Sequence, residues 1–504
     1  ESTYEFHSEP CWAVPVDVST PLETHMNLDF LMPLIREYPD QELVSFIKLG
    51  VRYKADLEPV ILLQPHLMSF LAVQDKFLKE ADRFIQRGWT EVHPCLPCIP
   101  FRCTACGSTC RPLEPDRPRC ANDAGAPRST CYADGIQVLS LNDAIDSGLL
   151  PLPQEIKPRS LDLLTGIRIM HEAAAILKMQ LLMATDDFAS FFNQLRLAPE
   201  ELWKTGVMHP PRSGQTSAQF AIDKVLGFGI RMASNIAQRF ANLIRHVFSR
   251  EMDRMDKEDL QLLRSASPEF DKWCCHRLQV ERRGLQQQLQ ASTNRMAAAN
   301  DSGDKVAISW AKHALEKATA AMGTEQVRLF FFLVYTDDPV WVTVGPDRMV
   351  KSLKLWHWLT SGAQFMMAIP EKRSLGTSGR WLGINFLAQL GISAVPAQKI
   401  LRACTSIDLV RSQSMSFSDY RRLIGFLEHI RDVLFLRGNT MYGLYAPHSN
   451  QLEPGDPVAS PHLSPRQVEL IYQMMIAWKD RLLQGAGCSI SHIDSFLSGG
   501  PVPA

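Results

Sequence analysis

Two pairs of adjacent aspartates follow apolar segments in this chain. One pair ends Tyr335-Thr336-Asp337-Asp338, which lies between the apolar segments 329–334 and 340–344. The other pair, Asp186-Asp187, follows the apolar segment 181–184. Strands that bring carboxylates together can bind divalent cations, which offset the repulsion between the negative charges. Two-metal nucleotidyl transfer uses such a site, because one ion activates a 3′-hydroxyl and both stabilise the displaced phosphate.

Apolar segments on both sides of a polar turn predict a β-hairpin at 329–344. An Asp-Asp pair in a turn also has a plainer interpretation, since turn carboxylates are often simply solvated. The second pair, on another predicted strand, favours the metal-binding interpretation.

Composition indicates a globular protein. The chain has 504 residues, of which 45% are hydrophobic and 21% are charged, so we expect two to four domains with a substantial core. The formal net charge is −1, so any phosphate binding must come from local basic patches. We find no secretory segment and no run of 18 apolar residues. The sequence therefore predicts an intracellular protein of the cytoplasm, the nucleus or both, without a membrane partner.

Six of the twelve cysteines lie between Cys95 and Cys120. Cys95, Cys98, Cys103 and Cys106 form two Cys-x-x-Cys pairs, a pattern that raises the question of structural zinc. The pairs are closer together than the separated pairs of a zinc ribbon. We expect reduced cysteines that serve as small buried side chains in strands, and we do not expect structural zinc.

Hydrophobic periodicity predicts the surrounding elements. The segment 26–90 is expected to be largely helical, with one helix opening at Asp40 and another over 67–88. Short strands are expected over 95–135, and a helix leading into a strand over 161–182. A glycine turn at 227–229 precedes a helix through Phe240 and Val247. Further helices are predicted within 396–450 and near 465–484, after a polar arm at 1–25.

The segment 251–326 differs in character because it is rich in Gln, Arg, Glu and Ala. Helices over 278–296 and 305–322, joined by the loop 300–304, predict an inserted helical hairpin. Two roles stay open for it: a solvated structural arm, or an arm that grips nucleic acid or a partner.

Four segments follow one another in a fixed order: 185–195, 227–234, 335–338, and 371–373 leading to 381–384. In this order they resemble motifs A to E in the palm of reverse transcriptases. Upstream, the segments from 79 to 123 resemble the fingers of that family, and 395–445 resembles the thumb or connection. The resemblance covers about residues 40–450. Within the family, the chain most resembles retroelement enzymes of the DIRS-like, tyrosine-recombinase type.

The resemblance implies an α+β right-hand polymerase with fingers, a palm built on a small antiparallel sheet, and a helical thumb. The expected division is an N-terminal arm and helical region at 1–90, fingers at 91–180, palm at 181–250 and 327–390, the insert at 251–326, thumb or connection at 391–450, and a C-terminal tail at 451–504.

The resemblance also implies site residues. Asp187, Asp337 and Asp338 align with the catalytic carboxylates, which hold two Mg²⁺ ions, with Mn²⁺ as an alternative. The Phe188 carbonyl is a further metal ligand. Asp187 is preferred to Asp186 because the family places an aromatic residue five positions after the motif A carboxylate, and Phe192 stands there.

Nucleotide-binding residues follow by the same resemblance. Arg111 and Arg119 would meet the triphosphate, since guanidinium groups suit phosphate oxygens. Phe228 and Gly229 would line the nucleotide pocket, and Lys372 would protonate the leaving pyrophosphate. The alternatives are a surface arginine, an ordinary turn glycine and a loop lysine.

Phe192 carries its own physical argument. A bulky ring beneath the sugar leaves no room for a 2′-hydroxyl, which favours deoxynucleotides. The alternative is that Phe191 and Phe192 are both core residues.

The expected partners are an RNA template, a DNA primer and product, and deoxynucleoside triphosphates. RNase H or recombinase domains of a polyprotein are further candidates. Other classes stay open: an RNA-dependent RNA polymerase, or a non-catalytic nucleic-acid-binding relic. The sequence departs from the family in the long insert and in Ser234, where a proline is usual. No HExxH, phosphate-binding P-loop or Gly-x-Ser-x-Gly motif is present.

Overall fold

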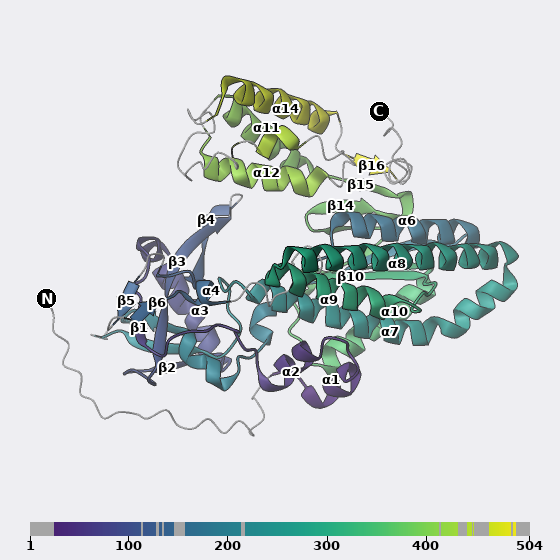
Figure 1. Cartoon of the computed structure of the whole chain (residues 1–504). Helices are drawn as coiled ribbons and strands as arrows, with labels where there is room; N and C mark the ends of the chain where they lie inside the picture. Colours follow the sequence, from purple (N-terminus) through teal and green to yellow (C-terminus); the bar gives the residue numbers. More distant parts are fainter. Residues whose placement is uncertain are drawn as a thin grey trace.

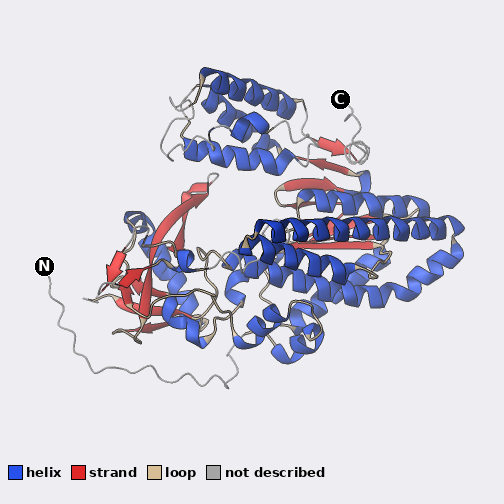
Figure 2. Cartoon of the chain, viewed as in Figure 1, coloured by secondary structure: helices blue, strands red, loops and turns tan. Residues whose placement is uncertain are grey.

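The computed structural model shows an α+β fold with three units: an N-terminal sheet lobe, a central sheet covered by helices, and a C-terminal helical bundle (Figures 1 and 2). It describes residues 25–111, 114–127, 131–133, 136–145, 157–212, 217–412, 415–431, 441–445, 447, 463–484 and 487–489. The polar arm expected at 1–25 lies almost wholly outside the described residues.

The central sheet carries both aspartate pairs. Its four antiparallel strands have the order β10-β11-β7-β12, with bounds Phe330–Tyr335, Asp338–Val344, Leu181–Thr185 and Ser374–Gly376. The predicted hairpin is confirmed: Tyr335 pairs with Asp338 across a two-residue loop. On the other side of β11, Val340 pairs with Thr185, so β7 ends beside the hairpin turn.

Side chains alternate across this sheet, as strand geometry requires. One face buries Leu333 and Val342 in a cluster with α6 (Ser160–Leu177). The other face buries Phe332 and Trp341 in a cluster with α7 (Ala233–Ala266) and α10 (Pro346–Gly362). Two apolar layers therefore hold the sheet from opposite sides.

Helix α7 is longer than predicted. It runs unbroken through residue 251, where the sequence suggested that the insert begins. Asp256 and Arg348, both buried, form an ion pair that fixes the distal half of α7 against α10. The helical hairpin itself begins only with α8 (Pro268–Ser302) and returns through α9 (Lys305–Ala321).

The α8–α9 hairpin packs through small residues. Buried Ser292 and Ala299 of α8 lie seven residues apart, as do Ala311 and Ala318 of α9. This spacing is that of a coiled-coil seam. The base of the hairpin is closed by an ion pair between Arg282 and Glu325.

The N-terminal lobe is built on a six-stranded mixed sheet with path β1-β3-β8-β9-β2, and β4 pairs with β3. The bounds are Ile61–Leu63 (β1), Thr90–His93 (β2), Phe101–Arg111 (β3), Glu114–Asp123 (β4), Gly206–His209 (β8) and Gln219–Asp223 (β9). A separate pair joins β5 (Cys131–Ala133) and β6 (Ile136–Val138). Smaller helices complete the lobe: η1 (Met68–Val73), α3 (Gln74–Gln86) and α4 (Leu141–Ala144). The strands β3 and β4 are much longer than the short pieces expected over 95–135.

The four cysteines that raised the question of zinc do not converge. Cys103 and Cys106 are both buried, but they lie three residues apart on β3 and join different apolar clusters. Cys95 is exposed. Residues three apart on a strand point to opposite faces, so this strand cannot direct both thiols at one ion.

Several expected domain boundaries differ from the structure. Helix α6, placed in the fingers by the boundary at 180, packs on the central sheet. Strands β8 and β9, placed in the palm, pair within the N-terminal lobe. Helices α1 (Leu28–Ile35) and α2 (Gln41–Leu49) pack on α7. Asp40, the N-cap of α2, accepts two hydrogen bonds from Arg239 of α7.

The C-terminal unit includes the segment expected as a tail. Helices α11 (Ala397–Arg411), α12 (Phe417–Arg431) and α14 (Pro465–Leu483) share one apolar cluster. Beneath them, β13 (Ser378–Trp381), β14 (Ile384–Leu387), β15 (Ile392–Ala394) and β16 (Gly487–Ser489) form an antiparallel sheet. Among the described helices, none has the length and apolar character needed to cross a membrane.

Candidate active site

Backbone hydrogen bonds bring the two aspartate pairs together. Asp186 N donates to Pro339 O at 3.2 Å, and Phe188 N donates to Asp337 O at 2.9 Å. The chain leaving β7 therefore runs directly beside the β10–β11 turn. This contact places Asp187 next to Asp337 and Asp338, at one end of the central sheet.

The three carboxylates influence one another. Burial, together with the charges of Asp337 and Asp187, raises the pKa of the Asp338 carboxyl to about 7, against an opposing effect of Lys372. Burial and the charges of Asp338 and Asp337 also raise the pKa of Tyr335. Negative charge is thus concentrated at the end of the sheet, which a cation would relieve.

Lys372 supplies part of the counter-charge. Its ammonium group forms an ion pair with the Asp187 carboxylate. The lysine side chain is 57% exposed, while that of Asp187 is 13% exposed. The lysine therefore reaches in from the surface to a largely buried acid.

Asp186 faces away from this site. Its carboxylate accepts hydrogen bonds from the Trp356 indole at 2.9 Å and from Arg373 Nε at 3.0 Å. The side chain is 6% exposed. These contacts satisfy Asp186 and fix the backbone that presents Asp187, so adjacent aspartates have separate roles.

The donor atoms fit a hard cation, since carboxylate oxygens are the ligands that Mg²⁺ prefers. The positions of these groups fit a metal ion less well than their chemistry does. Among the described residues, no group of three or more His, Cys, Asp and Glu side chains is close enough together to hold a metal ion. Asp187 is paired with Lys372 through one of its two carboxylate oxygens. Among the described cysteines of the N-terminal lobe, likewise, no such metal-binding group is found.

The turn that carries Asp337 is strained and braced. Thr336 has φ = +52°, a left-handed conformation that the first residue of a two-residue hairpin loop often needs and that a β-branched residue rarely adopts. Gln238 of α7, fully buried, accepts from Thr336 N at 2.9 Å and donates to Val334 O at 2.9 Å. The Gln238 side chain therefore fixes the backbone where β10 ends and the turn begins.

The two phenylalanines of the expected nucleotide pocket meet. The ring centroids of Phe192 and Phe228 are 4.2 Å apart. Phe192 is 7% exposed, whereas Phe228 is 62% exposed. Phe191, by contrast, is packed among core aromatics with Phe188 and Phe240. The buried ring of Phe192 is thus covered by a ring that is itself open to solvent.

Gly229 links this pocket to the N-terminal lobe. It has φ = +94°, and a Cβ there would meet Asn122 O of β4 at 2.1 Å, so only glycine fits. Asn142 of α4 donates to Gly229 O and accepts from Arg231 N. Gly227, in contrast, has no close backbone neighbour.

Arg111 and Arg119 lie on the β3–β4 ribbon. Arg119 pairs with Thr109 and Arg111 pairs with Glu114 in the backbone register. Their side chains lie outside the described part of the structure. The backbone places Arg119 three residues from Asn122, on the same strand that contacts Gly229.

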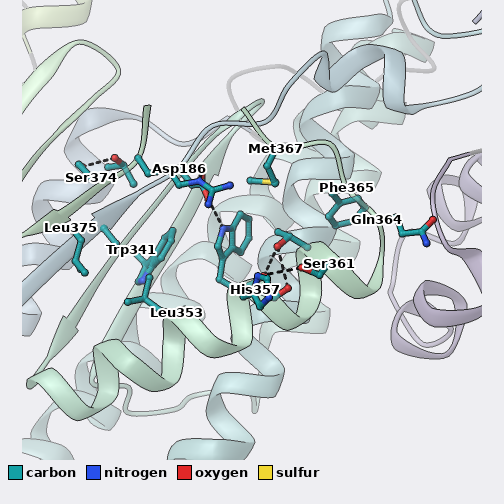
Figure 3. A pocket seen from close by; sticks show the side chains of 15 residues that line it. Asp186, Trp341, Leu353, His357, Ser361, Gln364, Phe365, Met367, Ser374 and Leu375 are labelled. Atoms are coloured by element: carbon teal, nitrogen blue, oxygen red, sulfur yellow. Dashed lines mark hydrogen bonds and ion pairs between the residues drawn. The ribbon is translucent and has the colours of Figure 1, made fainter. Parts of the chain in front are cut away.

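A cavity of about 540 Å³ lies behind the carboxylates, on the α10 side of the sheet (Figure 3). Figure 3 shows Asp186, Trp341 and Met367 around it, with His357 and Ser361 of α10 along its wall. Asp187, Asp337 and Asp338 do not line it. The cavity is therefore separate from the candidate site, although Asp186 borders it.

Gln238 and Arg373 support the candidate site through hydrogen bonds, and sequence reasoning gave neither of them a role. Gln238 carries a faint signal, because it is a polar residue within a predicted apolar helix face. Arg373 follows Lys372 in the motif-like segment but has no pattern that pairs it with Asp186.

No family model matches the sequence, and no curated protein matches it. Among solved structures, three of the foamy viral protease–reverse transcriptase are similar. A dRH form with double-stranded DNA has a TM-score of 0.42 at 10% identity, covering 93% of this chain and 62% of that one. A complex with an RNA/DNA hybrid has a TM-score of 0.43 at 11% sequence identity, and the match covers 92% of this chain and 47% of that one. A further complex with double-stranded DNA has a TM-score of 0.40 at 12% sequence identity, and the match covers 92% of this chain and 73% of that one. This chain thus spans about half to three quarters of their length, and similarity this weak assigns no family.

Proposed function

We propose that this chain is a template-directed DNA polymerase of the reverse-transcriptase type, from a retroelement. The observation that carries the proposal is the meeting of Asp187 with Asp337 and Asp338 at one end of an antiparallel sheet. In this proposal the central sheet is the palm, the N-terminal lobe the fingers, and the C-terminal bundle the thumb. The expected RNA template, DNA primer and deoxynucleoside triphosphates would bind between them.

Asp187, Asp337 and Asp338, with the Phe188 carbonyl, would hold two Mg²⁺ ions, which supply activation of the attacking hydroxyl and stabilisation of phosphate charge. The protein's own contribution is positioning. Arg373 and Trp356 hold Asp186, and thereby the backbone of Asp187. Gln238 holds the turn that presents Asp337.

Lys372 has two successive partners in this proposal. It neutralises Asp187 in the free protein. With cations held by the carboxylates, the ammonium of Lys372 would be available to donate a proton to the leaving pyrophosphate oxygen. Arg111 and Arg119 would approach the triphosphate from the β3–β4 ribbon.

Phe192 favours DNA over RNA synthesis. Its ring is packed in the core cluster with the exposed Phe228 ring over it, so the core side of Phe192 leaves it little room to move away from a 2′-hydroxyl. This contact weighs against the alternative of an RNA-dependent RNA polymerase. All three carboxylates are present, and Gln238, Trp356 and Arg373 hydrogen-bond to the backbone and side chains around them. This arrangement weighs against a non-catalytic relic.

The test is primer extension on an RNA template with Mg²⁺, with deoxynucleotides and ribonucleotides compared. We expect deoxynucleotide incorporation by the wild type and a fall to below about 1% of that rate for Asp337→Ala, because removal of preorganised charge stabilisation costs several kcal/mol. Asp347→Ala is the matched control, since Asp347 is exposed and follows the opposite end of β11.

Three results would reject parts of the proposal. Preferred incorporation of ribonucleotides would move the chain to the RNA polymerases. Full activity of Asp337→Ala would reject the carboxylate site. Absence of synthesis by a folded wild type that still binds a primer–template duplex would favour the binding relic.

A further inference from the structure

Lys157 joins three segments that are far apart in the sequence. It lies three residues before the start of α6, and its Nζ donates to Ser234 Oγ of α7 at 2.8 Å. The same Nζ lies 5.5 Å from the ring centroid of Tyr335, at the end of β10. Tyr335 immediately precedes the turn that carries Asp337. Lys157 is therefore fixed beside the candidate active site, although no motif marks it.

The partners of Lys157 are neutral. One is a hydroxyl group and the other an aromatic face, and none of the described carboxylates forms an ion pair with it. Lysines elsewhere in the described chain vary: buried Lys204 pairs with Glu201 and partly buried Lys351 pairs with Asp259, whereas partly buried Lys399 lies over the ring of Phe426. Burial lowers the pKa of Lys157, which reflects the loss of water without a compensating anion.

A cation held in this way is suited to an anionic ligand. Its ammonium has three donors, of which Ser234 takes one and the Tyr335 face attracts the group without accepting a conventional hydrogen bond. Lys157, Ser234 and Tyr335 are all only partly buried, so a ligand can reach the group from solvent. Tyr335 lies on the sheet face whose apolar cluster continues into the C-terminal bundle.

We propose that Lys157, held by Ser234 and Tyr335, binds a backbone phosphate of the nucleic-acid duplex whose primer end lies at the carboxylates. This inference rests on the proposed function, because it takes the duplex to lie along the sheet face that carries Tyr335. In that arrangement, a strand that ends at Asp337 runs past Tyr335 and Lys157. A compact ammonium group binds phosphate as a point charge and independently of the base sequence.

The experiment measures equilibrium binding of a fluorescent primer–template duplex over a range of salt concentrations, without nucleotides. A neutralised phosphate contact contributes about 0.9 to the slope of log K against log salt. We expect Lys157→Gln to lower the slope by about that amount and to weaken binding equally for two unrelated sequences. Lys157→Arg should restore the slope, since it keeps the charge.

Lys48→Gln is the matched control, because Lys48 is exposed on α2, which lies across the central unit from the C-terminal bundle in Figure 1. Its slope should equal that of the wild type. Thermal unfolding of each variant checks the fold. Ser234→Ala gives a second variant that keeps the charge, so its slope should stay close to that of the wild type.

An unchanged slope and affinity for folded Lys157→Gln would overturn the inference and leave Lys157 as a structural brace. Weaker binding with an unchanged slope would also overturn it, because the contact would then be to a base or sugar. A wild type that binds the duplex but extends no primer would contradict the proposed function alone. A wild type that binds no duplex would contradict both.

Discussion

At the scale of single residues, Phe192 gives the most direct prediction about specificity. Replacing it by valine removes ring volume beneath the nucleotide sugar while keeping an apolar side chain. We expect the ratio of kcat/KM for deoxynucleotides to that for ribonucleotides to fall on the order of 10- to 100-fold. Single-nucleotide incorporation with matched dNTP and rNTP pairs measures this ratio.

Phe192→Tyr is the control, since it keeps the ring in contact with Phe228. Its selectivity should stay close to that of the wild type. If Phe192→Val is folded and just as selective, the ring is a core residue and does not exclude the 2′-hydroxyl.

Asp223 gives a prediction about pH. Burial raises the pKa of this carboxyl to about 6, although hydrogen bonds from Thr90 and Asn122 oppose the shift. The folded state therefore holds the proton more tightly than the unfolded chain does, so ionisation destabilises the fold as pH rises from about 4 to about 6. Above that range the cost is fully present, and below it the cost disappears.

We expect Asp223→Asn to be more stable than the wild type at pH 7.5 by about 1 to 2 kcal/mol, a value reduced because the side chain keeps some solvent contact. The difference should vanish near pH 4. Chemical unfolding at several pH values tests this. A stabilisation that is the same at pH 4 and pH 7.5 would show that charge is not its cause.

At the scale of elements, the β10–β11 turn depends on a helix. Gln238→Leu leaves Thr336 N and Val334 O without their buried partner, which costs about 1 to 3 kcal/mol per group at most. We expect both lower stability and a lower kcat, because Asp337 loses its fixed position. Thermal unfolding and steady-state extension measure the two effects.

The control is Gln261→Leu, the same change at an exposed position of the same helix. It should leave kcat unchanged and alter the free energy of unfolding by no more than about 0.5 kcal/mol, as is usual for surface substitutions. A Gln238→Leu enzyme with normal kcat at a temperature where it is folded would show that the turn keeps its geometry without the brace.

The α8–α9 hairpin is predicted to be dispensable for folding. Neither of the two large apolar clusters contains a residue from 285–322. Contacts between Glu281 and Gln326 and between Arg282 and Glu325 close its base, so Gly284 and Gly323 can be joined by a short linker. We expect the shortened protein to unfold within about 4 °C of the wild type.

Calorimetry measures that difference, and duplex binding by the same variant separates the two roles open for the hairpin. Unchanged binding indicates a structural arm, and weakened binding indicates a grip. A collapse of the thermal transition would show instead that the hairpin supports the core.

Local patterns predicted the elements in which neighbours in sequence are also neighbours in space. The 329–344 hairpin and the helix opening at Asp40 are confirmed because their signals are complete within a few residues. The N-terminal sheet was not predicted, since β3 pairs with β8 about a hundred residues away. Gln238 and Lys157 were missed for the same reason: their partners are fixed by tertiary packing.

At the scale of the whole molecule, one apolar cluster joins two of the three units. It runs from α6 through the central sheet and the β13–β14 strands into α11, α12 and α14. Among the described residues, the N-terminal sheet has two small clusters of its own, around Phe70 and Phe101, while Leu141 of α4 belongs to the cluster of the central unit. We therefore expect the central unit and the C-terminal bundle to be coupled in unfolding, while the lobe opens more easily.

Trp478 of α14 tests this coupling. It is 3% exposed within the shared cluster, so Trp478→Ala should cost about 3 to 5 kcal/mol. Hydrogen exchange should accelerate in α11, α12 and α14 and, more weakly, in α6, whereas β3 and β8 should exchange as in the wild type. Leu483→Ala, at a 64% exposed position of the same helix, should change little. Faster exchange confined to α14 would show that the segment after residue 463 is a separate attachment, and faster exchange in β3 would show that all three units unfold together.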